Sequence, residues 1–204
     1  MKRCAIVCNG DVTDYSWLAA MLREHCTVLA ADGGLVHCRK AGVTPELVLG
    51  DMDSLFEETA VKKIVFPAEK NESDMELAVG YALQNGFNQI DVYGALGGRV
   101  DHQLCNIMVC ARYPGLLTII DSNYIITALS SGQNTRQEGK KGDIVTLIAL
   151  EESGRCYTEG LLYPLCDEIL IRGSRGLSNI MTGDVFSVSV SGGTVLIIHL
   201  KGES

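Results

Sequence analysis

The first 120 residues alternate short apolar runs with longer stretches that mix apolar and polar positions. The apolar runs predict buried strands over residues 4–8, 27–31, 47–49, 64–66, 89–93 and 116–120. Apolar residues at helical spacing lie between several of these runs, as at Trp17, Leu18, Met21 and Leu22. Repeated strand–helix units with buried strands are typical of a parallel sheet with helices on both faces. We therefore predict a parallel-sheet α/β domain over residues 1–121.

Polar residues indicate where some of the helices begin. Residues 54–57 and 73–76 both read Ser-x-x-Glu, the pattern of a capping box. The first predicts a helix that begins just after Asp53, and the second predicts a helix that Gly86 ends. We expect Asp101 to cap a further helix.

After Asp121 the helical periodicity disappears, and short runs rich in Val, Ile and Thr alternate with Gly, Ser and Asn. The turn Ser191-Gly192-Gly193 predicts a hairpin between the last two runs. This texture is typical of an antiparallel sandwich or barrel, and we predict a second domain over residues 122–204. Its strands are expected at residues 124–129, 144–150, 168–171, 185–190 and 194–200.

The 204 residues carry a net charge of −8, which limits the kinds of partner that the chain can bind. A chain this acidic lacks the basic surface of a duplex nucleic-acid binder and should avoid anionic membranes. If it binds an anionic substrate, it needs a metal ion or a local basic cluster, for which Lys70 and Arg99 are candidates.

Eight cysteines are present, without a Cys-x-x-Cys pair, and most of them lie in apolar runs. They predict small buried side chains in a reduced protein rather than a zinc site. No apolar run approaches the ~18 residues of a membrane span, and no secretion signal is visible. We therefore expect a cytoplasmic location.

Carboxylates gather where predicted strands end. Ligands of open parallel sheets bind at that edge, and carboxylates there favour a hard cation, usually Mg²⁺, that holds phosphate. Asp51 and Asp53 point the same way in an extended chain and repel each other unless a cation joins them. The simpler alternative is that Asp51 turns the chain and Asp53 stabilises a helix N-terminus. The whole set comprises Asp32, Asp51, Asp53, Glu72, Asp74 and Asp101.

The segment from Gly94 to His102 predicts a phosphate-binding loop, because its glycines let backbone N–H groups approach an anion closely. Arg99 can neutralise phosphate with two hydrogen bonds. The segment lacks the lysine of a Walker A loop, so a plain turn with a surface pair of Arg99 and Asp101 stays an alternative. A single histidine such as His102 is more often structural than catalytic.

In the second half, Tyr163-Pro164 resembles a rigid loop, and spacing alone favours a tyrosine ring packed under that loop. Taken in order, the motifs Asp32-Gly33-Gly34, Gly50-Asp51-Met52-Asp53-Ser54, Lys70 to Asp74, Gly97 to His102, Tyr163-Pro164-Leu165 and Ser178-Asn179 resemble those of bacterial thiamin pyrophosphokinases. That resemblance implies a Rossmann-like α/β domain followed by an antiparallel β-sandwich. It also implies a homodimer with active sites between subunits, and the reaction of ATP with thiamin to give AMP and thiamin diphosphate.

The resemblance also implies roles for particular residues. Mg²⁺ on the ATP phosphates would be held by Asp51, Asp53 and Asp74. The phosphates would also meet Asp32, Gly33, Lys70, Gly97, Gly98 and Arg99, with Asp101 supporting the same site. Thiamin would contact Tyr163, Ser178 and Asn179.

Three residues depart from the family's usual pattern: Asn71, Ser73 and Leu162. Two other functions stay open at this point. One is pyrophosphoryl or phosphoryl transfer to another small alcohol, such as a pterin. The other is a sensor that binds nucleotide or thiamin diphosphate without turnover.

Overall fold

A computed structural model of the protein describes residues 1–51, 60–67 and 71–202 and consists of two compact units. The first unit is Met1–Val109 with Ile119–Ser122, and the second is Cys110–Thr118 with Asn123–Ser204. That residues 1–121 and 122–204 form separate domains stays a prediction.

Five parallel strands form the sheet of the first unit, in the spatial order β5-β1-β2-β3-β4, with β6 (Leu117–Ile120) next to β5. Ala5 of β1 lies opposite Val28 of β2 and Asp91 of β5, so β1 is a central strand. Their bounds are β1 (Arg3–Val7), β2 (Val28–Ala31), β3 (Leu47–Gly50), β4 (Lys62–Val65) and β5 (Gln89–Tyr93). The predicted parallel sheet is therefore confirmed.

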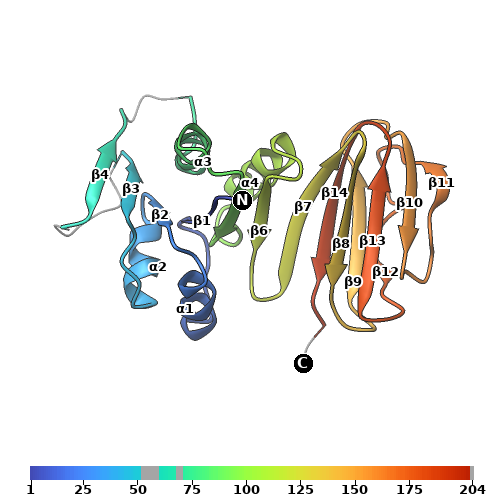
Figure 1. Ribbon diagram of the computed structural model, residues 1–204, viewed down its shortest axis with the longest axis horizontal. Helices are drawn as coiled ribbons and strands as arrows, with labels where there is room; N and C mark the ends of the chain where they lie inside the picture. The colour runs from blue at the N-terminus through green and yellow to red at the C-terminus, as the bar shows by residue number, and fades with distance from the viewer. Residues whose placement is uncertain (52–59, 68–70, 203–204) are drawn as a thin grey trace. The chain divides into compact units, whose positions relative to one another are not determined.

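Helices cover both faces of this sheet. Figure 1 shows α1 (Tyr15–Arg23) and α2 (Gly34–Lys40) on one face and α3 (Asp74–Gln84) on the other. Crossovers between parallel strands are right-handed, so the direction of a crossover decides which face of the sheet its helix covers. The chain moves one way across the sheet from β1 to β3, which places α1 and α2 on one face, and returns from β4 to β5, which places α3 on the other. Every residue of β2 and β3 is consequently buried, as expected for strands covered on both faces.

The helix starts agree only in part with the sequence. The capping box of α3 is confirmed: the Glu76 N–H donates to Ser73 Oγ over 3.2 Å, and the Ser73 N–H donates to Glu76 Oε2 over 3.0 Å. The expectation that Asp101 caps a helix is wrong, because α4 (Val100–Arg112) begins one residue earlier and has Asp101 in its first turn. The helix expected after Asp53 lies outside the described residues.

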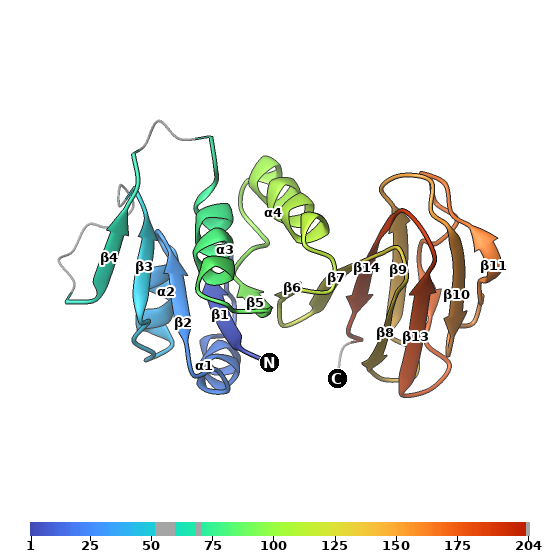
Figure 2. The ribbon, with the colours of Figure 1, turned by 45° about the horizontal axis from the view of Figure 1, so that its top comes forward.

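The second unit contains two antiparallel sheets, ordered β12-β9-β14-β7 and β11-β10-β13-β8. Figure 2 shows strands of the two sheets facing each other, which confirms the sandwich and not the barrel. The first sheet comprises β7 (Tyr124–Ser130), β9 (Ile144–Ala149), β12 (Asn179–Ile180) and β14 (Thr194–Leu200). The second comprises β8 (Gln133–Glu138), β10 (Arg155–Glu159), β11 (Cys166–Ile169) and β13 (Val185–Val190).

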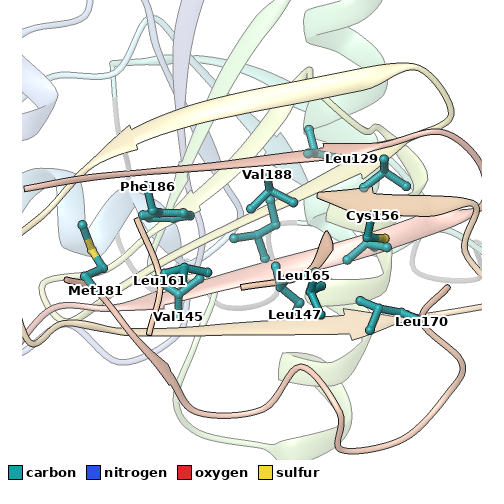
Figure 3. Packing of buried hydrophobic residues seen from close by; sticks show 14 residues of the cluster. Leu129, Val145, Leu147, Cys156, Leu161, Leu165, Leu170, Met181, Phe186 and Val188 are labelled. Carbon is teal, nitrogen blue, oxygen red and sulfur yellow. The ribbon is translucent and has the colours of Figure 1, made fainter. Parts of the chain in front are cut away.

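The core of the sandwich follows from alternation along its strands. Phe186, Val188 and Val190 of β13 are buried, whereas the residues between them are only half-buried. Figure 3 shows Phe186 and Val188 facing Val145 and Leu147, which come from the other sheet.

The predicted hairpin at Ser191-Gly192-Gly193 is wrong, although the strands on either side have the predicted bounds. β13 pairs with β8 and β10, whereas β14 pairs with β7 and β9, so the turn joins strands of different sheets. The Gly154 N–H donates to the Gly192 carbonyl over 2.7 Å and holds this connection.

All eight cysteines are free thiols. Five are buried as predicted, but Cys26, Cys105 and Cys166 are exposed. Burial raises the pKa of the Cys8 and Cys38 thiols to about 12. In the described part of the chain, no helix has the length and apolar character needed to cross a membrane.

Candidate active site

A cavity of about 590 Å³ lies in the first unit, where the segments after β1, β2, β3 and β5 meet the first turns of α3 and α4. This is the edge at which open parallel sheets bind ligands. Its lining consists of Cys8, Asn9, Gly10, Ala31, Asp32, Asp51, Glu72, Ser73, Asp74, Met75, Ala95, Gly97, Gly98, Arg99, His102 and Asn106.

Acidic side chains dominate this cavity. Four of its lining residues are carboxylates, namely Asp32, Asp51, Glu72 and Asp74, and Arg99 is the only guanidinium among the described lining residues. Asp53 and Lys70, predicted to act here, lie outside the described residues. Among the residues that are described, no three carboxylate, imidazole or thiol groups lie close enough together to hold a metal ion.

Asp32 has an unusual backbone. Its φ angle of 44° lies in the left-handed region, which is costly for most residues and which aspartate tolerates better than most. Two hydrogen bonds hold the backbone there: its N–H donates to the Leu49 carbonyl over 2.7 Å, and its carbonyl accepts from the Leu35 N–H over 3.2 Å. The residue is 5% exposed, so the strained turn presents a nearly buried carboxylate to the cavity.

The start of α3 contributes to the lining its N-cap residue Ser73 and, from its first turn, Asp74 and Met75. Asp51 and Asp74 are half-buried. The N-terminal end of a helix carries partial positive charge, which favours an anion and offsets part of the local acidity.

Residues 94–99 connect β5 to α4, and we call them the glycine loop; their backbone lies at the cavity. Gly97 and Gly98 have φ angles of 84° and 67°, a left-handed conformation that glycine adopts without strain. The Gly98 N–H donates to Asp11 Oδ2 over 3.0 Å. A Cβ on Gly97 would lie 2.4 Å from the Cβ of Asp11, so only glycine fits between this carboxylate and the cavity. At the base of the loop, Asn106 Nδ2 donates to the Ala95 carbonyl over 2.8 Å.

Arg99 and Asp101 form an ion pair, with Arg99 Nε donating to Asp101 Oδ1 over 3.1 Å and Nη2 donating to Oδ2 over 2.6 Å. Hydrogen bonding to Arg99 lowers the pKa of Asp101 to about 2. The side chains are 74% and 64% exposed, so the pair is the surface pair considered as an alternative. Such a pair contributes little free energy, and Arg99 can exchange Asp101 for a bound anion. Arg99 lines the cavity and Asp101 does not.

Gly33 also lies outside the lining, and the Asn9 side chain fills the space that a Cβ on Gly33 would need. The sequence reasoning missed Asn9, Gly10 and Asn106 as lining residues. Asn9 and Gly10 directly follow the first strand, so the rule that ligands bind beyond strand ends could have found them. Asn106 has no such signal, because it lies inside a helix among apolar neighbours.

The second unit presents Tyr163 on a loop pinned by Asn179. The Tyr163 N–H donates to Asn179 Oδ1 over 2.9 Å, and Asn179 Nδ2 donates to the Tyr163 carbonyl over 2.6 Å. The tyrosine is 60% exposed, so the expectation from spacing that it packs under its own loop is wrong. Asn179 is 6% exposed and its amide is engaged at both ends.

The neighbouring Ser178 is exposed and has a φ angle of 55°. Its N–H donates to Thr146 Oγ1 over 3.0 Å, which ties this loop to β9. The proposed contacts of Tyr163, Ser178 and Asn179 with thiamin stay predictions.

Comparison with known proteins identifies relatives of this chain. The family model described as thiamin pyrophosphokinase, catalytic domain, matches residues 18–118. The chain is 30% identical to the thiamine pyrophosphokinase of Bacillus subtilis (strain 168) over 178 residues, which cover 81% of this chain and 82% of that protein. It is 28% identical to thiamin pyrophosphokinase 1 of Caenorhabditis elegans over 149 residues, covering 64% of this chain and 61% of that one.

Solved structures share the fold. The crystal structure of thiamine pyrophosphokinase from Bacillus subtilis matches with a TM-score of 0.86 at 24% identity, over 99% of this chain and all of that chain. The thiamin pyrophosphokinase from Candida albicans matches with a TM-score of 0.77 at 18% identity, over 98% of this chain and 89% of that chain. With its ordered motifs, its α/β unit, its sandwich and this similarity to the Bacillus subtilis protein, the chain belongs to the thiamin pyrophosphokinase family.

Proposed function

We propose that this chain transfers the diphosphoryl group of ATP to the hydroxyl of thiamin, giving thiamin diphosphate and AMP, and that the cavity of the first unit holds the triphosphate. The observation that carries the proposal is the combination of four carboxylates, a glycine loop and one arginine around a single cavity. A triphosphate cannot enter so acidic a cavity unless cations offset the repulsion, and a family that uses ATP supplies the reason for the acidic residues.

The donor set fits Mg²⁺, since hard cations prefer carboxylate oxygens. Asp51, Asp53 and Asp74 are the residues we assign to it, with Asp32 supporting them. When bound, Mg²⁺ neutralises charge on the phosphates and aligns them.

The chain's own residues then position the reaction. The oxygen of the thiamin hydroxyl forms a bond with the β-phosphorus, and the bond from that phosphorus to the α,β-bridging oxygen breaks, so that AMP leaves. Arg99 and Lys70 stabilise the charge that develops on the phosphates. A nearby aspartate takes the hydroxyl proton. We assign the Gly97–Gly98 loop to contact with the phosphates. Gly33 and Asp101 are assigned to the support of this phosphate site.

Thiamin binding is assigned to Tyr163, Ser178 and Asn179. The thiazolium ring is a cation, and an exposed tyrosine face binds such a ring with about 1–2 kcal/mol once water is excluded.

The proposal includes a homodimer whose active sites form between subunits. It is supported by two exposed apolar side chains next to the residues assigned to thiamin in the sequence: Leu162, which precedes Tyr163, is 50% exposed, and Leu177, which precedes Ser178, is 57% exposed. Eight free thiols support the cytoplasmic location that is part of the same proposal.

The test is to incubate the purified protein with ATP, Mg²⁺ and thiamin and to separate the nucleotides. We expect AMP and thiamin diphosphate in equal amounts, and no AMP when thiamin is omitted or EDTA is added. ADP in place of AMP would mean transfer of a single phosphate. Product formation with a pterin and not with thiamin would assign another acceptor, and ATP binding without any product would leave a sensor.

A further inference from the structure

Residues 9–11 lie against the glycine loop and hold it along its length. The Gly10 N–H donates to the Gly94 carbonyl over 2.7 Å, and the Asp11 N–H donates to the Leu96 carbonyl over 2.8 Å. The Gly98 N–H donates to Asp11 Oδ2 over 3.0 Å. Three hydrogen bonds therefore tie the segment after β1 to the loop that follows β5, and the third depends on the Asp11 side chain.

We infer that Asp11 is a positioning residue that fixes the phosphate-binding conformation of the glycine loop, an inference that rests on the proposed function. Two consecutive left-handed residues, Gly97 and Gly98, leave a loop with much freedom in the unfolded chain. A charged acceptor makes a stronger hydrogen bond to a backbone N–H than a neutral one does. The Asp11 carboxylate can therefore hold one conformation of this loop against the alternatives.

Asp11 acts through the loop rather than on the substrate. It is absent from the cavity lining, whereas Gly97, Gly98 and Arg99 all belong to it. A carboxylate also repels phosphate, so a direct contact between Asp11 and the triphosphate would oppose binding. The contact of Asp11 with Gly97 is close, since its Oδ2 lies 2.5 Å from the place a Cβ on Gly97 would take. The side chain thus packs against the loop without lining the cavity.

The segment that carries Asp11 is itself held from behind. In α2, Nε2 of His37 lies 2.8 Å from the carbonyl oxygen of Gly10, and Nδ1 of the same ring lies 2.9 Å from the hydroxyl oxygen of Tyr15. Only 9% of the histidine is exposed. The support of the glycine loop therefore runs from α2 through Gly10 to Asp11.

The experiment compares Asp11→Ala, Asp11→Asn and Asp14→Ala with the unchanged chain. Asp14 is a matched control, because it lies three residues away and accepts the Trp17 N–H at the start of α1 instead of contacting the glycine loop. Calorimetry gives the Kd for a non-hydrolysable ATP analogue with Mg²⁺, and steady-state assays give KM for ATP and for thiamin. Hydrogen exchange measured by mass spectrometry reports on the peptide that contains Gly97 to Arg99.

We expect Asp11→Ala to weaken analogue binding and lower kcat/KM for ATP by roughly tenfold, as for loss of a hydrogen bond to a charged group, with KM for thiamin changed less than about twofold. Exchange should rise in the glycine loop and stay unchanged in α1. Asp11→Asn should recover part of the loss, since its amide oxygen can still accept from Gly98 but is a neutral and weaker acceptor. Asp14→Ala should lower Tm without changing KM for ATP.

Three results would overturn the inference. In the first, Asp11→Ala binds the analogue as well as the unchanged chain does. In the second, Asp11→Asn is as impaired as Asp11→Ala, which would assign the effect to charge alone. In the third, exchange rises equally over the loop and α1, which would mean general destabilisation. If the unchanged chain binds the analogue but makes no thiamin diphosphate, the proposed function fails while analogue binding and exchange still test Asp11.

Discussion

His37 donates a hydrogen bond from Nε2 to the carbonyl oxygen of Gly10, 2.8 Å away. The direction follows from chemistry, because a carbonyl oxygen can only accept. In the neutral ring, Nδ1 is then the acceptor for the Tyr15 hydroxyl. Burial lowers the pKa of His37, and the charge of Lys40 lowers it further, while the Gly10 bond and Asp11 act to raise it. The folded protein therefore prefers the neutral ring that this arrangement uses.

That preference predicts a loss of stability in mild acid. A histidine whose pKa is lower in the folded state than in the unfolded state contributes its full stability above the unfolded pKa of about 6.5 and loses it as the pH falls below that value. Burial also lowers the pKa of His25, so the two effects add. Urea unfolding at pH 8 and pH 5.5 should give the smaller free energy of unfolding at pH 5.5.

A variant of His37 separates the contribution of this histidine from other acid effects. His37→Gln should show a weaker pH dependence than the unchanged chain, whereas His102→Gln should keep it, because His102 is exposed. Identical pH dependence in all three proteins would contradict the assignment to His37.

Removing one of the proposed metal carboxylates should abolish most of the turnover. Asp51→Asn keeps the size of the side chain and removes its charge, so we expect kcat to fall by about 10²- to 10³-fold, as when one electrostatic stabiliser is lost. The Tm should change little, because Asp51 is only half-buried. The measurement is kcat at saturating ATP and thiamin over a range of Mg²⁺ concentrations, with Asp53→Asn alongside.

The matched control for the carboxylates is Asp184→Asn, an exposed aspartate of the second unit. It should leave kcat and its Mg²⁺ dependence unchanged. Turnover near that of the unchanged chain in both Asp51→Asn and Asp53→Asn would remove these two residues from the proposed metal site.

Tyr163→Ala should raise KM for thiamin by roughly 5- to 30-fold, the equivalent of about 1–2 kcal/mol of cation–π energy. KM for ATP should change less, and Tyr163→Phe should restore most of the binding because it keeps the ring. Tyr157→Ala is the control, since this tyrosine is also exposed but lies on β10. Equal changes in both KM values would instead make Tyr163 a structural residue.

The free thiols divide into an exposed and a buried class, and a thiol reagent should distinguish them by their rates of modification. Cys26, Cys105 and Cys166 are exposed, and the other five cysteines are buried. Burial raises the pKa of the Cys4 thiol, as of Cys8 and Cys38, to about 12, so these groups stay protonated and unreactive at pH 8. Titration of the native protein with an aromatic disulfide should modify three thiols quickly and all eight after unfolding. Fast modification of more than three would contradict the described burial.

The apolar runs predicted much of the fold, because strands that bury one or both faces carry apolar residues that can be recognised from the sequence alone. The runs at 185–190 and 194–200 match β13 and β14 residue for residue. β8 escaped prediction because all six of its residues are polar. α2 escaped because it is short, begins with Gly34 and has Gly33 as an N-cap without a side-chain hydrogen bond. The hairpin prediction failed because a turn sequence does not specify the sheet of the next strand.

The candidate site was predictable where a strand end coincides with a carboxylate, as at Asp32 and Asp51. Asp11 was not predictable in this way, because its contact joins residues 87 positions apart. The exposure of Tyr163 could not be read from spacing either, since it depends on the buried amide of Asn179, which pins the loop.

The central place of β1 affects how the chain is made on the ribosome. Cys4, Ala5, Ile6 and Val7 are fully buried between β2 and β5, but β5 is not complete until Tyr93. At roughly 5–20 residues per second, a nascent chain keeps one edge of this apolar strand open for several seconds after β2 has formed. Chaperones that bind exposed apolar strands should therefore hold nascent chains arrested before β5 and release them once it has emerged.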